Sequence, residues 1–197
     1  MGRSTGLEPA TLGTTNRCSN QLSYERREAP WRTRAAPLRV MSFEGKRGSM
    51  NATIEKFGYP ETLIREYEHW VLLLRPAQVT AGSLVLAAKS DAKAYGDLPV
   101  EAFVEQARAV AELEEMLRSA VNYEKINYLM LMMVDPEVHF HVIPRYGDDR
   151  FLADIRISDS GFPGPPDLKS AITLDHASIG AAVQLLKAYL PDGAKQV

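Results

Sequence analysis

Glu137-Val138-His139-Phe140-His141-Val142-Ile143-Pro144-Arg145 is the stretch that decides both the fold and the chemistry. A β-strand turns alternate side chains to opposite faces. Glu137 and the two histidines are therefore expected on one face, and the apolar residues between them on the other, where they can pack on a core. Two imidazoles and a carboxylate in a row on a rigid element make a candidate chemical site.

The chain before this stretch predicts three further strands. An apolar run ends at Pro76, Ala81-Gly82 marks a turn, and an apolar run follows it. A third run, rich in Met, Leu and Tyr, ends at Asp135-Pro136, where a tight turn would make it antiparallel to the motif strand. The strands are expected over residues 69–75, 83–88, 126–134 and 137–143.

Helical periodicity separates the strand pairs and closes the chain. Apolar residues at three- and four-residue spacing, Val104 among them, predict an amphipathic helix over about 99–121. Shorter helices are expected over 60–68 and 178–190. The order predicts an α+β fold, an antiparallel β-sheet with a long packed helix and a C-terminal helix. The Gly- and Pro-rich stretch 161–166 is expected to be a structured loop or an arm over a neighbouring surface.

Composition excludes several classes of protein. The net charge of −2 implies no general attraction to nucleic acid or to an anionic membrane. No apolar run approaches the roughly 20 residues needed to span a bilayer, and no secretory signal is visible. Cys18 is the single cysteine, so no intramolecular disulfide can form. This favours a reducing compartment, and we expect a cytoplasmic protein.

Residues 1–49 differ in charge from the rest of the chain. They carry 9 Lys+Arg and 4 Asp+Glu, a balance of +5, whereas residues 50–197 carry 14 and 21, a balance of −7. Either the basic arm binds nucleic acid or phosphate, or it is not part of the mature protein. We favour the second interpretation, because residues 6–24 resemble the conceptual translation of a transfer-RNA gene. The chain would then start at Met50 or Met41, with residues 1–49 a disordered or mis-annotated extension.

Three interpretations of the two histidines compete. A metal site would need further ligands, but only Glu137 is near in sequence and His69 and His176 are distant, so we expect no metal. Alternatively, His139 could attack a phosphoryl group while His141 steadies the phosphate oxygens. In the third interpretation, the two histidines only decorate an exposed strand.

The residues around the histidines resemble the signature strand of the histidine-triad (HIT) superfamily, in which histidine and apolar residues alternate and Pro-Arg often follows. The similarity covers residues 54–146 and implies a HIT-like domain over 50–197, commonly a homodimer. It implies that His139 attacks the α-phosphate of a nucleotide conjugate, that His141 contacts the phosphate, and that no cofactor is needed. The other ring nitrogen of His139 would hold its proton against a backbone carbonyl.

This chain departs from the family pattern at three points. Glu137 replaces the first histidine of the motif, where its carboxylate could orient His139 but would repel an incoming phosphate. Ser83 follows Gly82 where many members have a further histidine, and it cannot shuttle protons near neutral pH. Asp135-Pro136 replaces the Gly-Gln-Ser/Thr loop that helps to hold the leaving group.

Other side chains are weaker candidates for contact with the nucleotide. By resemblance, Gln78 and Arg75 would contact the ribose, although Arg75 could equally be a surface charge. Asn127 could face the nucleotide or cap a sheet edge, and Phe57 could wall the base. Arg145 is expected to pair with an acidic neighbour, and Met130, Met132 and Met133 to pack in the core or in a dimer.

Two functions follow from these observations. The leading hypothesis is a nucleotide hydrolase or nucleotidyl transferase that acts on adenosine-type conjugates, such as diadenosine polyphosphates, through a nucleotidyl-histidine. The alternative is a non-catalytic nucleotide-binding module, which the replacement of the first histidine by Glu137 and the missing loop motivate.

Overall fold

The computed structural model describes residues 50–191, so the predicted extension over residues 1–49 lies outside the described residues. Its helices are α1 (Ala52–Lys56), α2 (Val100–Val121) and α3 (His176–Ala188), with short 3-10 turns η1 (Tyr95–Asp97) and η2 (Leu168–Ser170). Its strands are β1 (Leu63–Glu66), β2 (Trp70–Leu74), β3 (Ala77–Gln78), β4 (Leu84–Ala88), β5 (Lys125–Leu129), β6 (His139–Arg145), β7 (Arg150–Leu152), β8 (Ile155–Ile157) and β9 (Ile172–Thr173).

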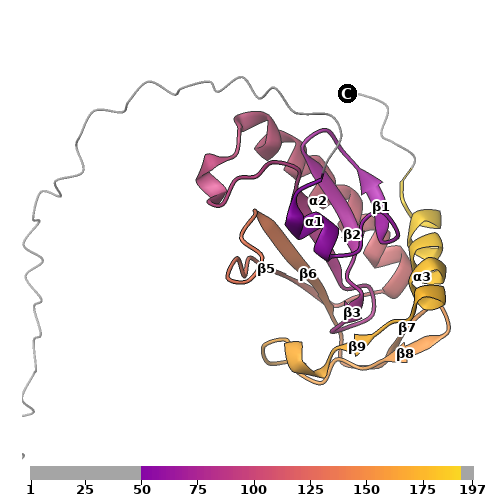
Figure 1. Ribbon diagram of the computed structural model, residues 1–197. Coiled ribbons are helices and arrows are strands. Elements are labelled where there is room, and N and C mark those ends of the chain that lie inside the picture. The colour runs from indigo at the N-terminus through magenta and orange to yellow at the C-terminus, as the bar shows by residue number, and fades with distance from the viewer. Residues whose placement is uncertain (1–49, 192–197) are drawn as a thin grey trace, which may run out of the picture. The chain divides into compact units, whose positions relative to one another are not determined.

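The main sheet has the order β1-β2-β4-β6-β5, and every neighbouring pair in it is antiparallel (Figure 1). Two small antiparallel pairs, β3 with β9 and β7 with β8, complete the β-structure. The prediction of an α+β fold built on an antiparallel sheet is thus confirmed. The motif strand β6 lies inside the sheet, between β4 and β5.

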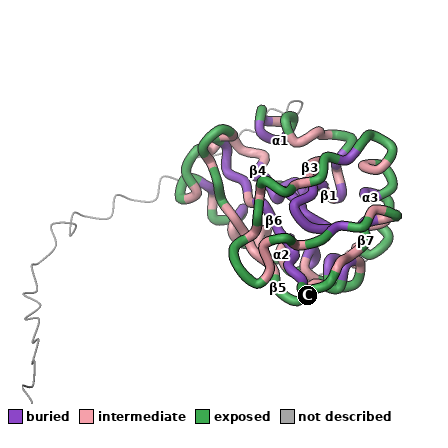
Figure 2. Tube along the Cα trace, turned by 90° about the horizontal axis from the view of Figure 1, so that it is seen from below, coloured by how far each residue is buried: buried purple, intermediate pink, exposed green. Residues whose placement is uncertain are grey.

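The two faces of the sheet have separate apolar clusters. One face packs against α2 and α3, and burying each large side chain there contributes of the order of 2 kcal/mol. The other face packs against α1 through a smaller cluster of Ile54, Val71, Leu73, Val85 and Ala87. Figure 2 shows the central strands in purple, as buried backbone behind exposed loops. Each central strand therefore places alternate residues in different environments.

The predicted long helix is present, but only part of its expected apolar face is buried. Its buried residues include Ala109, Leu113, Met116 and Leu117, whereas Val104 is 69% exposed. The helix ends at Val121 and is capped by Asn122, whose left-handed φ of 48° closes the last turn. The predicted C-terminal helix is also confirmed and begins slightly earlier, with the Asp175 carboxylate accepting a hydrogen bond from Ser178 N at 2.8 Å.

The predicted helix over 60–68 is wrong, because this segment forms the edge strand β1. Its backbone bonds to β2 at both ends, through Leu74 N to Thr62 O and Tyr67 N to Trp70 O, both 2.8 Å. Pairing with a buried strand satisfies more backbone groups than one isolated helical turn would. A short helix does occur, but earlier in the chain, as α1.

The last two strands are displaced from their predicted bounds. β5 ends at Leu129 instead of continuing to Val134, and residues 130–138 form a longer connection than the expected tight turn. β6 runs on through Pro144 to Arg145. Proline fits there because β4 pairs with β6 only as far as Val142, so no strand on that side needs an N–H from Pro144. Among residues 50–191, no helix is both long and apolar enough to span a membrane.

Candidate active site

The histidines of β6 lie on the face that α1 covers. His139 stands opposite Ala87 and His141 opposite Val85, and both of these β4 residues belong to the apolar cluster under α1. Directly opposed residues of an antiparallel pair share a face. Val138 and Val142 pack on the other side with α2. The alternation predicted from the sequence is therefore confirmed.

The two ring nitrogens of His139 have different surroundings. Its imidazole is fully buried, and its Nδ1 lies 2.8 Å from the backbone carbonyl oxygen of Glu137. A carbonyl only accepts hydrogen bonds, so Nδ1 carries the proton and Nε2 the lone pair. Nε2 is buried and has no hydrogen-bond partner within residues 50–191. The result is a positioned, unprotonated nitrogen.

The Glu137 carboxylate does not bond to His139, contrary to expectation. Thr53 of α1 donates its hydroxyl hydrogen to Glu137 Oε2 over 2.5 Å. Residue 137 thus orients His139 through its main chain and fastens α1 to the sheet through its side chain. Because the orienting group is a backbone carbonyl, this orientation does not depend on which side chain stands at position 137.

His141 completes the pair on the same face. Its ring lies 5.0 Å from that of His139, nearly perpendicular to it. Burial first, and then the neighbouring His139 and the charge of Arg75, lower the pKa of His141 to about 4. His141 is therefore neutral near pH 7 and can offer one N–H to an oxyanion. The Phe57 ring, just after α1, lies 5.6 Å from both imidazoles and walls the site on that side.

Arg75 follows β2 and supplies positive charge to the site. Its charge is one of the causes of the low pKa of His141. One terminal nitrogen donates to the carbonyl of Ala77, but Nε is buried and has no partner in the described part of the chain. Burial also lowers the pKa of the guanidinium itself, although arginine stays protonated at neutral pH. A half-buried cation with an unused donor suits an anionic ligand.

Ser83 and Gln78 are both fully buried in the connection from β2 to β4. Gln78 Nε2 donates to Ser83 O over 2.9 Å, and Gln78 Oε1 accepts from Ser83 N at 3.0 Å. The Ser83 hydroxyl bonds to Thr80 O at 2.8 Å. Gly82, with φ +79°, lets this connection pass close to α2, since a Cβ there would meet Leu117 at 2.9 Å. These polar groups thus hold the connection together.

Arg145 has the acidic partner predicted for it. Its Nε and one terminal nitrogen donate to Asp159 over 2.6 and 3.1 Å, and the ion pair is almost completely buried. The guanidinium also donates to Gly164 O at 2.9 Å and to Asn127 Oδ1 at 2.8 Å. Asn127 therefore supports Arg145, and together they hold the segment 159–164 against the sheet.

A groove of about 360 Å³ lies between that segment and strand β5. Its lining residues are Lys125, Asn127, Leu129, Arg145, Phe162, Pro163, Gly164, Pro165 and Pro166. Leu129 stands opposite His141 in the sheet, and Lys125 opposite Arg145. The groove therefore begins at the β5 residue opposite His141 and runs along β5 on the same face.

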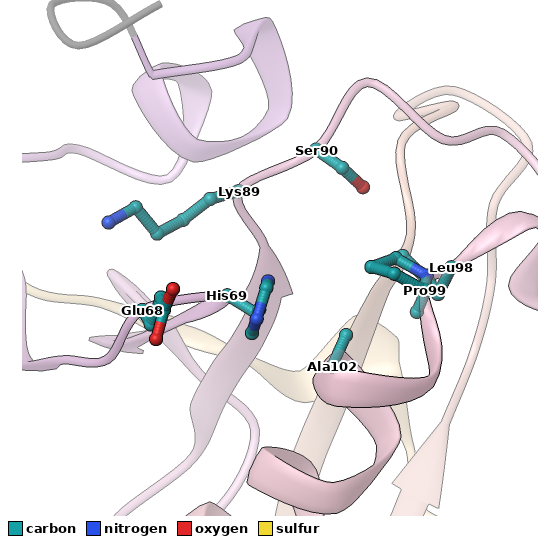
Figure 3. A pocket seen from close by; sticks show the side chains of 7 residues that line it. All are labelled: Glu68, His69, Lys89, Ser90, Leu98, Pro99 and Ala102. Atoms are coloured by element: carbon teal, nitrogen blue, oxygen red, sulfur yellow. The ribbon is translucent and has the colours of Figure 1, made fainter. Parts of the chain in front are cut away.

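A second hollow, of about 20 Å³, has room for roughly one water molecule. It lies where β2 and β4 meet the start of α2, and Figure 3 shows His69, Lys89 and Ser90 among the side chains that line it. His69 thus lines this hollow. Within residues 50–191, no three His, Cys, Asp or Glu side chains are grouped so that they could hold a metal ion.

Comparison with known proteins places the fold. No protein-family model matches the sequence, and a search of curated proteins finds no match. Solved structures do match. A histidine triad protein from Bradyrhizobium japonicum is 15% identical, with a TM-score of 0.56, over 72% of this chain and 97% of its own. A histidine triad protein from Sinorhizobium meliloti is 19% identical, with a TM-score of 0.56, over 72% of this chain and 96% of its own.

A hypothetical histidine triad nucleotide-binding protein from Sulfolobus tokodaii is 16% identical, with a TM-score of 0.51, over 65% of this chain and 82% of its own. The chain has the histidine-triad fold. At these identities the likeness concerns the fold, which the sequence resemblance had predicted, and the roles of the residues rest on the geometry above.

Within the histidine-triad fold, the structure brings together His139, His141, Arg75 and the main chain of Glu137. It keeps Ser83, Gln78 and Asn127 in supporting hydrogen bonds. Sequence reasoning missed Thr53, the groove and Lys125. The Gly- and Pro-rich composition of residues 161–166 did signal an arm over a neighbouring surface, but not that this surface is the chain's own β5.

Proposed function

We propose that this protein is a nucleotide hydrolase or nucleotidyl transferase that acts on the α-phosphate of adenosine-type nucleotide conjugates. The observation that carries the proposal is His139, whose Nδ1 is held by the Glu137 carbonyl at 2.8 Å while Nε2 is buried and unpartnered. A nitrogen with its lone pair fixed in place avoids the cost of orienting a free nucleophile.

In the first step, His139 Nε2 attacks the α-phosphorus, and the bond from phosphorus to the leaving-group oxygen breaks. The leaving group departs with the electron pair of that bond. The developing charge on the phosphoryl oxygens is met by an N–H of neutral His141 and by the guanidinium of Arg75. The charge of Arg75 also offsets the negative charge that Glu137 brings near the site.

In the second step, water attacks the phosphorus of the nucleotidyl-histidine. The N–P bond breaks, its electron pair returns to His139 Nε2, and the proton of the water passes to solvent. A different nucleophile in place of water would make the protein a transferase. The Ser83, Gln78 and Asn127 side chains shape the site in this scheme, and Phe57 walls the nucleoside.

The experiment is replacement of His139 by Asn, with diadenosine tetraphosphate as substrate. The variant should lose at least about a thousandfold in kcat, as expected for removal of a covalent nucleophile, while its circular dichroism spectrum stays unchanged. His176→Asn, which changes an exposed histidine at the start of α3, is the matched control and should keep full activity. A His139→Asn protein with the wild-type rate would refute the mechanism.

A specific observation also favours the non-catalytic alternative. The His139 imidazole is fully buried, with Phe57 beside both histidines and Glu137 in place of the first histidine of the family motif. A site closed in this way could retain a nucleotide without turning it over. Calorimetry that shows tight adenosine monophosphate binding, together with no product from any conjugate, would select this alternative.

We also propose a homodimer in the cytoplasm. The outer edge of β5 is unpaired within the described sheet. Large apolar side chains of the following connection are exposed, with Met133 at 90% and Val134 at 80%. An open strand edge next to exposed apolar residues is a surface that favours association.

A further inference from the structure

We propose that Thr53 is a positioning residue for the phosphate that meets His139. By holding the Glu137 carboxylate on α1, it keeps this negative charge from turning toward the phosphorus. This inference rests on the proposed function. A site with glutamate in place of the first motif histidine can then still accept an anion.

The Glu137 side chain stands close enough to the nucleophile to interfere with it. Its bond to Thr53 of α1 places it on the face of the sheet that carries the histidines. Positions 137 and 139 are separated by roughly 7 Å, at roughly 3.3 Å per residue. A carboxylate free to rotate there would bring a negative charge against a phosphate at His139 Nε2, and like charges repel strongly in a buried site.

The bond from Thr53 restrains this carboxylate. The hydroxyl donates to Glu137 Oε2 over 2.5 Å, a length typical of charge-assisted bonds between hydroxyl and carboxylate. Both side chains are buried, which strengthens the bond. Nε2 of His139 and Nδ1 of His141 have no partner within residues 50–191, so the carboxylate bonds to neither nitrogen. Thr53 thus holds Glu137 in an orientation that leaves the nucleophile free.

Other interactions are sufficient to dock α1 on the sheet. The Asn51 side chain donates to Ala88 O and Ser90 O over 2.8 and 2.9 Å, and it caps α1 by accepting from Ile54 N at 3.0 Å. Ile54 is fully buried in the apolar cluster under α1. These interactions remain when the Thr53 hydroxyl is removed, so Thr53→Val should keep α1 in place.

The second carboxylate before the motif strand is also held by α1. Asp135 forms an ion pair with Lys56. Burial is the main cause of the low pKa of His141, and the charge of Asp135 opposes it, so this carboxylate too acts on the site. Asp135 and Glu137 are the acidic residues of the connection 130–138. Each therefore has a partner on the same short helix.

The test measures the binding of adenosine monophosphate and of adenosine by calorimetry. Thr53→Val keeps the size of the side chain and removes its hydroxyl. It should weaken adenosine monophosphate about tenfold, because a bond to a charged group is lost and the carboxylate is freed, and leave adenosine within about twofold. A loosened α1 would instead weaken both ligands alike, since it would disturb the wall that Phe57 forms.

Replacement of Glu137 by Gln identifies the charge as the cause. Thr53→Val combined with Glu137→Gln should bind adenosine monophosphate within about twofold of Glu137→Gln alone, and Thr53→Ser, which keeps the hydroxyl, should bind it like the wild type. Thr62→Val is the matched control, because the buried Thr62 hydroxyl bonds to Phe57 O at 2.9 Å. Any loss that it causes should be the same with and without Glu137→Gln.

The outcomes separate this inference from the proposed function. If Thr53→Val weakens both ligands equally or neither, or if Glu137→Gln does not relieve the loss, the role of Thr53 is overturned, even where the wild type turns over diadenosine tetraphosphate. If the selective loss and its relief appear but the wild type turns over no conjugate, the proposed catalysis fails and the role of Thr53 stands. A wild type without measurable affinity for adenosine monophosphate would overturn both.

Discussion

At the residue scale, His139 is a candidate nucleophile because its main-chain neighbour fixes its tautomer. The Glu137 carbonyl occupies Nδ1, which leaves the lone pair on Nε2 in a buried position. We propose the complementary role for His141, because it is held neutral and so can donate one N–H without carrying charge into a buried site. Replacement of the first motif histidine by Glu137 removes neither arrangement.

His141 should titrate far below an ordinary histidine. Its folded-state pKa of about 4 lies below the usual 6.5, so the unfolded chain binds this proton first as the pH falls. The contribution to the free energy of unfolding is therefore complete above pH 6.5 and is lost as the pH falls to about 4, up to about 3 kcal/mol. A nuclear magnetic resonance titration should find the midpoint near 4, and His141→Asn should remove this part of the pH dependence. A midpoint at 6 or above would contradict the account.

The sequence predicts the pair of histidines and their shared face, because alternation along a strand is local. It does not predict that Thr53 binds the Glu137 carboxylate, since 84 positions separate the two residues and only the docking of α1 brings them together. The acidic partner of Arg145 was expected from its charge, but its identity as Asp159 follows from tertiary structure.

At the element scale, two short segments lie on the face of the sheet that carries the histidines. α1 and Phe57 cover the histidines, fastened by the bonds of Asn51 to Ala88 O and Ser90 O, at 2.8 and 2.9 Å. The segment 159–166 covers β5 and is fastened by Arg145. Both depend on a few buried polar bonds, because neither segment has a large apolar face.

Asp159→Ala should destabilise the fold by about 3–5 kcal/mol, since it leaves the buried guanidinium of Arg145 without its partner. The measurement is urea unfolding followed by tryptophan fluorescence. Asp154→Ala, an exposed aspartate in the same part of the chain, should cost less than about 0.5 kcal/mol. Equal stabilities of the two variants would show that the ion pair does not hold the segment.

Element types followed from periodicity where the pattern was long, as in α2 and α3. The helix predicted over residues 60–68 was wrong. The few apolar residues there fit a helix and an edge strand equally well, and pairing with β2 decides between the two. The predicted apolar face of α2 was only partly right, because Val104 is apolar yet 69% exposed. Such choices depend on contacts between distant segments.

At the scale of the whole molecule, the open edge of β5 and the exposed Met133 and Val134 make association the expected state. The same edge strand also lines the groove between β5 and the segment 159–166. Met130 is 41% exposed and Met133 is 90% exposed, so neither lies in the core. Of the two locations predicted for them, core or dimer, only the dimer remains.

Light scattering after size exclusion should therefore give twice the chain mass of 21.9 kDa. Met133→Lys should shift the population to the monomer, because a charge in an apolar contact loses its hydration. Val100→Lys, at an exposed apolar position on α2, is the control and should leave the dimer intact. A wild-type monomer at micromolar concentration would contradict the dimer.

The central claim is that His139 forms a covalent bond to the α-phosphate. Brief incubation with labelled diadenosine tetraphosphate, an acid-free quench and mass spectrometry of the peptides test it directly. The account predicts one adenylyl group, on His139, that is absent from His139→Asn. Turnover with no adduct on any histidine, or an adduct on His141 in its place, would contradict it.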